Sequence, residues 1–133
     1  MTVTLNTLFF IGCIPTGLLV LLGFAKVLRN DRLIKKIIVL ALLFASLGFF
    51  IQVEDKDVGP GFAPATLAAP LVYILSYTIL RFIYKSLYKV EPTYNRSSWY
   101  DHEDNRRQNW LDVFVHLFPW LFSLIFPLFF LSK

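Results

Sequence analysis

Uncharged stretches and short charged stretches alternate along this chain. No Asp, Glu, Lys or Arg occurs at residues 1–25, 37–53, 58–80 or 113–132. A helix that crosses the hydrocarbon core of a bilayer needs about 20 mainly apolar residues, within a range of about 17–25. Each stretch has this length, so the pattern predicts an all-α integral membrane protein with four transmembrane helices.

The charged stretches also set the boundaries of the predicted spans. The chain is expected to form a single membrane domain, residues 1–133. We place the spans at about residues 6–26, 34–53, 65–86 and 112–131. The predicted cytoplasmic loops are residues 27–33 and 87–111, and the predicted outer loop is residues 54–64.

Basic residues fall almost entirely on one side of the predicted bundle. Eleven of the 13 Lys and Arg residues lie in or beside the two loops named as cytoplasmic, and the other two are Lys56 and Lys133. Short cytoplasmic loops carry an excess of Lys and Arg. We therefore expect both termini on the outer, non-cytoplasmic side. The compartment is expected to be a bacterial inner (cytoplasmic) membrane, with a eukaryotic organelle membrane as the alternative.

Composition and charge agree with this class of protein. Of the 133 residues, 56% are hydrophobic, and the mean hydropathy is +0.60. No Lys or Arg precedes the first apolar stretch, so we expect a retained helix rather than a cleaved signal peptide. The net charge of +4 follows from the loops and does not indicate nucleic-acid binding.

The polar segment before the last span contains a helix-start signal. Ser98 is followed three residues later by Asp101, a spacing that resembles a capping box. Trp99 and Trp110 would share one face of a helix over residues 98–112. We expect a short interfacial helix with its indoles at the headgroup level. Direct continuation into the last span is the alternative.

Small residues recur on one side of each of the first two predicted spans. Such rows allow helix backbones to approach closely in a membrane. We expect these two spans to form an antiparallel hairpin, because only a short turn joins them. The helix-packing residues are Gly12, Thr16 and Gly23 in the first span and Ala41, Ala45 and Gly48 in the second.

Four tyrosines and an arginine share one side of the third predicted span. At 100° per residue, Tyr73, Tyr77, Arg81, Tyr84 and Tyr88 fall within an arc of roughly 80°. An aromatic belt at the membrane boundary accounts for the last two tyrosines but not for the two deeper ones. Our hypothesis is that this stripe is a helix–helix interface, within the bundle or with a partner subunit.

Two further groups of polar residues are candidate sites. Asp112 and His116 are four residues apart, on one helix face, as in a proton relay. The alternative is an interfacial histidine satisfied by water or headgroups. The run Asp101–Asp104 points around a helix and does not converge on a metal ion. We expect it to form a solvated face that balances Arg106 and Arg107.

The expected function is that of a non-catalytic accessory or assembly subunit of a larger membrane complex, such as a secretion, transport or respiratory machine. Its expected partners are other integral membrane subunits and the lipid bilayer, and no cofactor, metal or catalytic residue is expected. A homo-oligomeric pore or transporter, with Gln52, Arg81 and the tyrosines along its pathway, is one alternative. A membrane immunity protein that neutralises a toxin is another. An enzyme would need Asp101, His102, Glu103 and Asp112 to assemble.

Overall fold

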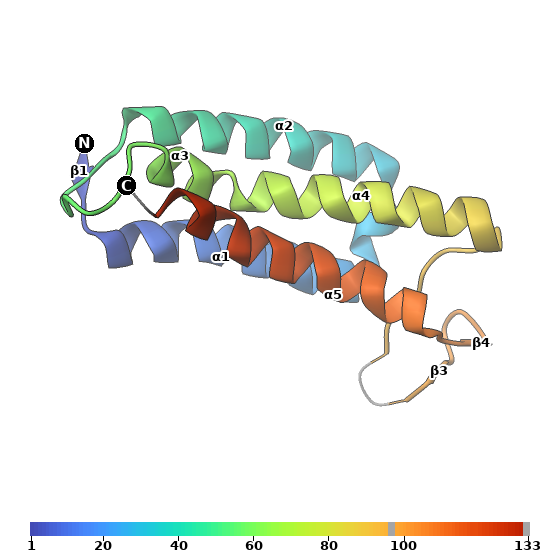
Figure 1. The fold of residues 1–133 in the computed structure, drawn as a ribbon. Coiled ribbons are helices and arrows are strands. Elements are labelled where there is room, and N and C mark those ends of the chain that lie inside the picture. Colours follow the sequence, from blue (N-terminus) through green and yellow to red (C-terminus); the bar gives the residue numbers. More distant parts are fainter. Residues whose placement is uncertain (96–97, 132–133) are drawn as a thin grey trace.

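The computed structural model describes residues 1–95 and 98–131, and most of this chain is helical (Figure 1). Arg96 and Lys133, two of the basic residues in the loop comparison, lie outside the described residues. The α-helices are α1 (Leu5–Phe24), α2 (Asp31–Leu47), α3 (Phe62–Leu67), α4 (Ala69–Tyr88) and α5 (Trp110–Ile125). Short 3-10 turns extend or follow three of them: η1 (Val27–Arg29), η2 (Gly48–Phe50) and η3 (Phe126–Phe130).

Two very small sheets lie at opposite ends of the bundle. Strand β1 (Thr2–Val3) pairs in parallel with β2 (Gln52–Val53). Strand β3 (Tyr100–Asp101) pairs antiparallel with β4 (Arg106–Arg107). Figure 1 shows the start of the chain and η3 at the end with β1, and the hairpin of β3 and β4 at the other. We call the first the terminal end and the second the charged end.

The helices are long and apolar enough for a membrane protein. In the described part of the chain, three segments could span a bilayer by length and composition: Leu5–Phe24, Asp31–Phe50 and Trp110–Phe130. The prediction of a mostly helical membrane-type chain is confirmed to this extent. Helix α4 is 20 residues long as well, but Arg81 and Lys85 make it less apolar, and it is not among these three.

Helix α4 forms the centre of the bundle. It contacts α1, α2 and α5 and lies between α2 and the α1–α5 layer (Figure 1). The expected hairpin of the first two spans is therefore wrong. Helices α1 and α2 pack mainly on α3 and α4, and an open groove of about 450 Å³ lies between them.

The small residues still allow close backbone contacts, but with other partners. A Cβ atom added to Gly12 would lie 2.6 Å from the carbonyl oxygen of Thr66, and one added to Gly48 would lie 2.4 Å from Cα of Pro64. A Cβ atom on Gly23 would lie 2.7 Å from the Tyr73 hydroxyl. Of the remaining predicted packing residues, Thr16 and Ala41 are buried and Ala45 is partly buried.

The segment predicted as an outer loop is partly a buried helix. Helix α3 packs between α1 and α2 at the terminal end, and Phe62, Ala63 and Leu67 are almost fully buried. Pro70 follows within the first turn of α4, where a missing N–H costs nothing. This arrangement explains the contacts of Gly12 and Gly48, because the α3 backbone fills the space that a side chain there would need.

The expected interfacial helix at residues 98–112 is also wrong. This segment forms the β3–β4 hairpin, and the last helix begins only at Trp110, after the N-cap Asn109. The side chain of Asp101 accepts hydrogen bonds from the backbone N–H groups of Glu103 and Asp104. It therefore stabilises a turn rather than the predicted capping box at Ser98.

Gly12→Ala should destabilise the bundle, because its Cβ would meet backbone atoms that cannot move independently. We expect a loss of about 1–3 kcal/mol in the free energy of unfolding, measured by denaturant or thermal unfolding in mild detergent. Gly17→Ala in the same helix is the matched control, because nothing lies within 4 Å of its added Cβ. Equal effects of the two changes would contradict the close α1–α3 contact.

Candidate functional site at the charged end

Arg81 lies at the centre of the charged end and is only 5% exposed. Its guanidinium donates to both carboxylate oxygens of Glu91, at 2.8 and 2.7 Å, and to Asp31 at 2.7 Å. It also donates to the carbonyl oxygen of Arg29 at 2.8 Å. These contacts join α4 to the start of α2 and to the segment that follows α4, so the arginine is neutralised inside the chain.

The rest of the predicted tyrosine stripe is also directed into the bundle. Tyr73, Tyr77 and Tyr84 are at most 2% exposed, whereas Tyr88 is 44% exposed. The rings of Tyr73 and Tyr77 stack at 6.1 Å. Two partners were possible for this stripe, the bundle itself or another subunit, and the buried tyrosines and Arg81 contact the bundle. Among the five stripe residues, Tyr88 is the exposed one.

Asp112 carries a second buried charge and is fully buried. Arg106 donates to its two oxygens at 2.6 and 3.1 Å. The backbone N–H groups of Thr93 and Asn109 donate to the same carboxylate at 2.9 and 2.7 Å. Because Asn109 also caps the helix through Asp112 N–H, this carboxylate fixes the start of α5, the hairpin and the post-α4 segment together.

The relay idea required a hydrogen bond between His116 and the Asp112 carboxylate, but the histidine bonds to the backbone of Asp112 instead. Its Nδ1 lies 2.7 Å from the Asp112 backbone carbonyl oxygen; since a carbonyl can only accept, Nδ1 carries the hydrogen. The ring is buried and packs against Tyr94 at 5.4 Å and Tyr77 at 5.8 Å. It is therefore part of an aromatic cluster rather than an interfacial histidine satisfied by water or headgroups.

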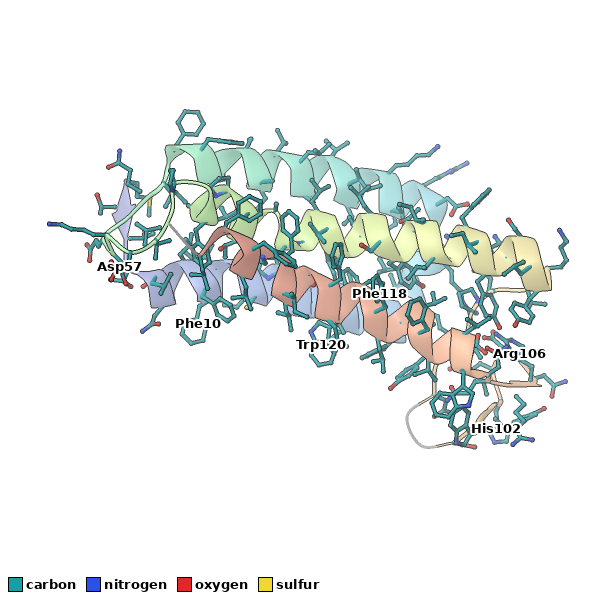
Figure 2. All side chains as sticks on the ribbon, viewed as in Figure 1. Phe10, Asp57, His102, Arg106, Phe118 and Trp120 are labelled. Atoms are coloured by element: carbon teal, nitrogen blue, oxygen red, sulfur yellow. The ribbon has the colours of Figure 1, made fainter. Side chains whose placement is uncertain are left out.

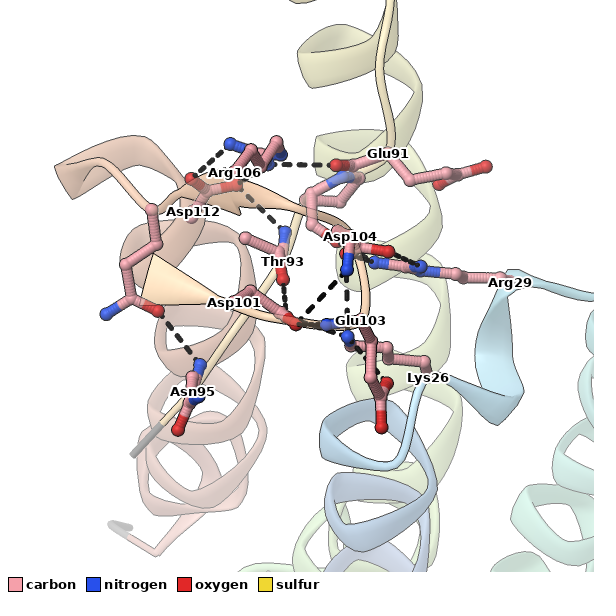
Figure 3. A network of polar contacts seen from close by, with 12 residues as sticks. Lys26, Arg29, Glu91, Thr93, Asn95, Asp101, Glu103, Asp104, Arg106 and Asp112 are labelled. Carbon is pink, nitrogen blue, oxygen red and sulfur yellow. Dashed lines mark hydrogen bonds and ion pairs between the residues drawn. The ribbon is translucent and has the colours of Figure 1, made fainter. Parts of the chain in front are cut away.

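A third group of charges closes the charged end over α1. Figure 3 shows Lys26 and Arg29 extending from the α1–α2 connection towards the hairpin. Lys26 Nζ lies 2.7 Å from Asp101, and Arg29 donates to Asp104 at 2.8 Å. The expectation of a solvated face at Asp101–Asp104 is wrong for Asp101, which is 3% exposed and also accepts a hydrogen bond from the Thr93 hydroxyl.

The ion pairs hold the hairpin carboxyls in their charged form. Hydrogen bonding to Arg29 keeps the pKa of Asp104 well below its ordinary value of 3.8. Burial alone would raise the pKa of Asp101, but hydrogen bonds from Lys26, Thr93 and two backbone amides outweigh this effect and lower it to about 2. The carboxyls therefore act as structural anions rather than as acids that exchange protons near neutral pH.

An open cavity of about 500 Å³ lies beside this network, lined in part by Lys26, Tyr94 and Asp101. The charged atoms along it already contact each other, and Glu103 also pairs with Lys26 at 2.7 Å. Within residues 1–95 and 98–131, no three His, Cys, Asp or Glu side chains form a group that could hold a metal ion. Of the four residues that an enzyme would need, Asp112 pairs with Arg106, whereas Asp101 and Glu103 both pair with Lys26.

Sequence reasoning missed the partners of the buried charges. It identified Arg81 and Asp112 but not Asp31, Glu91 or Arg106. One signal was present, because an arginine at membrane depth requires a nearby anion. Asp31 is the first residue of α2, and Glu91 follows shortly after the end of α4. Choosing them needs the three-dimensional arrangement, since Asp31 is 50 residues from Arg81.

Asp112→Ala should destabilise the charged end, because it leaves Arg106 and two backbone donors without their acceptor. Removing one partner of a buried ion pair costs about 3–5 kcal/mol. Unfolding in mild detergent measures this loss. Asp57→Ala, which removes an exposed carboxylate at the terminal end, is the control. An Asp112→Ala protein as stable as the control would contradict the central role of this carboxylate.

Acidification should weaken the hairpin through Asp101. A carboxyl whose pKa is lower in the folded than in the unfolded state stabilises the fold above its unfolded pKa, and this stabilisation is lost as the pH falls through the folded pKa. With a folded value of about 2 and an ordinary value of 3.8, the unfolding temperature should fall across this window. Asp101→Asn should flatten part of that fall, whereas Asp57→Asn should keep the wild-type profile. Identical profiles for all three proteins would exclude Asp101 as the cause.

Comparison of the chain with protein-family models, with curated proteins and with solved structures finds no match.

Proposed function

We propose that this chain is a four-span integral membrane protein. In this proposal α4 is the fourth span, in addition to the three helices that hydropathy identifies. Three observations support this assignment. Helix α4 is 20 residues long, lies between the three apolar helices, and buries Arg81 against two carboxylates of the chain. A neutralised arginine that faces a bundle interior is compatible with a membrane helix.

The proposed orientation places both termini on the outer side of a bacterial inner membrane. The supporting observation is the charge asymmetry between the ends of the bundle. The terminal end carries the acidic residues Glu54, Asp55 and Asp57, and the charged end carries most of the Lys and Arg residues. The excess of basic residues favours the cytoplasm for the charged end.

Within this membrane we propose a non-catalytic accessory subunit that binds other membrane subunits through helix–helix contacts. One observation carries the proposal, a row of five phenylalanines along α5 and η3 that we call the phenylalanine ridge. Neighbouring rings of the ridge lie 5.0, 5.6, 6.3 and 5.5 Å apart. Its members are Phe114, Phe118, Phe122, Phe126 and Phe130.

The ridge has the properties of a preformed docking surface. Phe114, Phe118 and Phe122 are 45%, 40% and 37% exposed, and Phe118 is labelled in Figure 2 beside α5. Helix association in lipid depends on van der Waals packing, because apolar side chains gain no hydrophobic energy by leaving lipid. Rings already ordered by stacking lose little freedom when they pack against a partner.

The internal chemistry of the chain supports a binding role over the alternatives. Arg81 pairs with Asp31 and Glu91, so its charge is not presented along a conduction pathway. Gln52 belongs to β2 at the terminal end, far along the bundle from Arg81. No specific observation favours the pore or the immunity protein over an accessory subunit.

Recovery of the tagged chain in mild detergent, followed by native mass spectrometry, tests the proposal. We expect complexes with different membrane subunits in fixed stoichiometry. Phe118→Ala should reduce their recovery by about tenfold, since losing a well-packed aromatic contact costs on the order of 1–3 kcal/mol.

Leu43→Ala is the matched control, because Leu43 is a 60% exposed apolar residue on α2, away from the ridge. The control should recover the complexes at the wild-type level. Recovery of the wild-type chain only as a monomer or homo-oligomer would contradict the accessory role. Equal losses for both variants would contradict the assignment of the interface to the ridge.

A further inference from the structure

Exposed residues on the outer side of α4 change from apolar to basic along the helix. Leu75, Ile79, Phe82, Ser86 and Lys89 are separated by four, three, four and three positions, so they follow one helix face. The first three are 41%, 58% and 71% exposed, and the last two are also exposed. This row, which we call the outer stripe of α4, therefore runs from hydrocarbon-like side chains to a cation.

The outer stripe ends in a cleft at the charged end. The cleft has a volume of about 360 Å³ and is formed by the last turns of α4 and the first residue of α2. Its lining residues are Asp31, Thr78, Arg81, Phe82, Lys85, Ser86 and Lys89. Two members of the outer stripe, Ser86 and Lys89, thus belong to a concave basic site, and Phe82 forms its apolar edge.

The cleft keeps cationic donors that the chain does not use. Arg81 is committed to Asp31 and Glu91, and Lys85 uses one contact of 2.9 Å to Glu91. An ammonium has three N–H donors, so Lys85 retains two. Lys89 makes no ion pair within the described residues and retains all three. The carboxylate of Asp31 faces the same cleft but is bound to Arg81, and three basic residues outnumber it there.

We propose that this cleft binds the phosphate of an anionic phospholipid headgroup. Lys85 and Lys89 contact the phosphate, and an acyl chain of the same lipid lies along Phe82, Ile79 and Leu75. The proposal rests on the placement of α4 in the membrane under the proposed function. Basic pockets between membrane helices on the cytoplasmic side are suited to such headgroups.

A lipid fits better than a free phosphate ion, because its headgroup matches the basic cleft and its acyl chain matches the apolar residues of the outer stripe. A free ion would use the cations alone and leave Phe82 and Ile79 without a role. A lipid uses the whole outer stripe, and its headgroup lies at the level where the apolar side chains give way to Ser86 and Lys89. The separate contribution of the acyl chain is therefore the feature that distinguishes the two ligands.

Native mass spectrometry of the full chain in mild detergent, with added phosphatidylglycerol or phosphatidylcholine of the same acyl chains, tests the proposal. We expect phosphatidylglycerol to be retained preferentially. Lys89→Gln should lower its occupancy about fivefold, since one lysine near an anionic lipid surface contributes on the order of 1 kcal/mol. Lys36→Gln is the matched control, with the same change of net charge at an exposed lysine of α2 outside the cleft.

The outcomes separate the possible explanations. Equal losses for Lys89→Gln and Lys36→Gln, or no loss for Lys89→Gln, would overturn the site. Inorganic phosphate alone is tested as well. If it raises the unfolding temperature of the wild-type chain as much as phosphatidylglycerol does, the lipid assignment is overturned. Unfolding temperatures of the variants report their folding, and Lys89→Gln should keep the wild-type value because it breaks no ion pair. The measurement uses the isolated chain, so loss of partner subunits in the Phe118→Ala experiment leaves its result unchanged.

Discussion

The burial of Arg81 is the constraint on which the architecture of the charged end depends. A guanidinium that is 5% exposed cannot lose its proton and would be strongly destabilising without compensation, because the effective cost of burying an ion is several kcal/mol. Asp31 and Glu91 supply that compensation from both sides of α4. The start of α2 and the chain after α4 must therefore fold back onto the same helix. Arg81, the side chain least compatible with lipid, therefore determines which segments come into contact.

The position of α4 at the centre of the bundle follows from the same constraint. Its tyrosines and Arg81 form one polar face, and the interior of the bundle is the environment in which Tyr73, Tyr77 and Tyr84 are buried. Helices α1, α2 and α5 pack against it and turn apolar residues outward. This explains why α1 and α2 do not form the expected hairpin: both pack on α4 and on the short α3. Gly12 and Gly23 of α1 and Gly48 of η2 allow the close approach of residues 64–73. Small residues indicate where a backbone approaches closely, and they do not identify the neighbour.

The sequence was informative where local pattern decides the structure. Uncharged runs indicated the three apolar helices α1, α2 and α5, and the 100° spacing of the tyrosines indicated the face of α4 on which Tyr73, Tyr77 and Tyr84 are buried. It was uninformative where distant contacts decide. The spacing of Ser98 and Asp101 fits a capping box, but Asp101 instead accepts hydrogen bonds from its own turn and pairs with Lys26, 75 residues earlier. Asp112 was noted for its distance from His116, whereas its carboxylate binds Arg106 and the Thr93 amide. Local capping and turn signals compete with each other, and long-range ion pairs determine which of them is used.

Ion pairs at the charged end commit five of its basic residues to contacts inside the chain. Asp31, Glu91, Asp101, Asp104 and Asp112 each bind an arginine or lysine of the chain, so their partners cannot also serve an external anion at full strength. Within the described residues, the Lys and Arg side chains without an ion pair are Arg32, Lys35, Lys36, Lys56, Lys89 and Arg107. Of these, Lys89 is the one that lines the cleft on α4, next to a lysine with donors to spare. The ion pairs that stabilise the bundle therefore also determine where an anionic ligand would bind, because such a ligand is attracted to the lysines that have no acidic partner inside the chain.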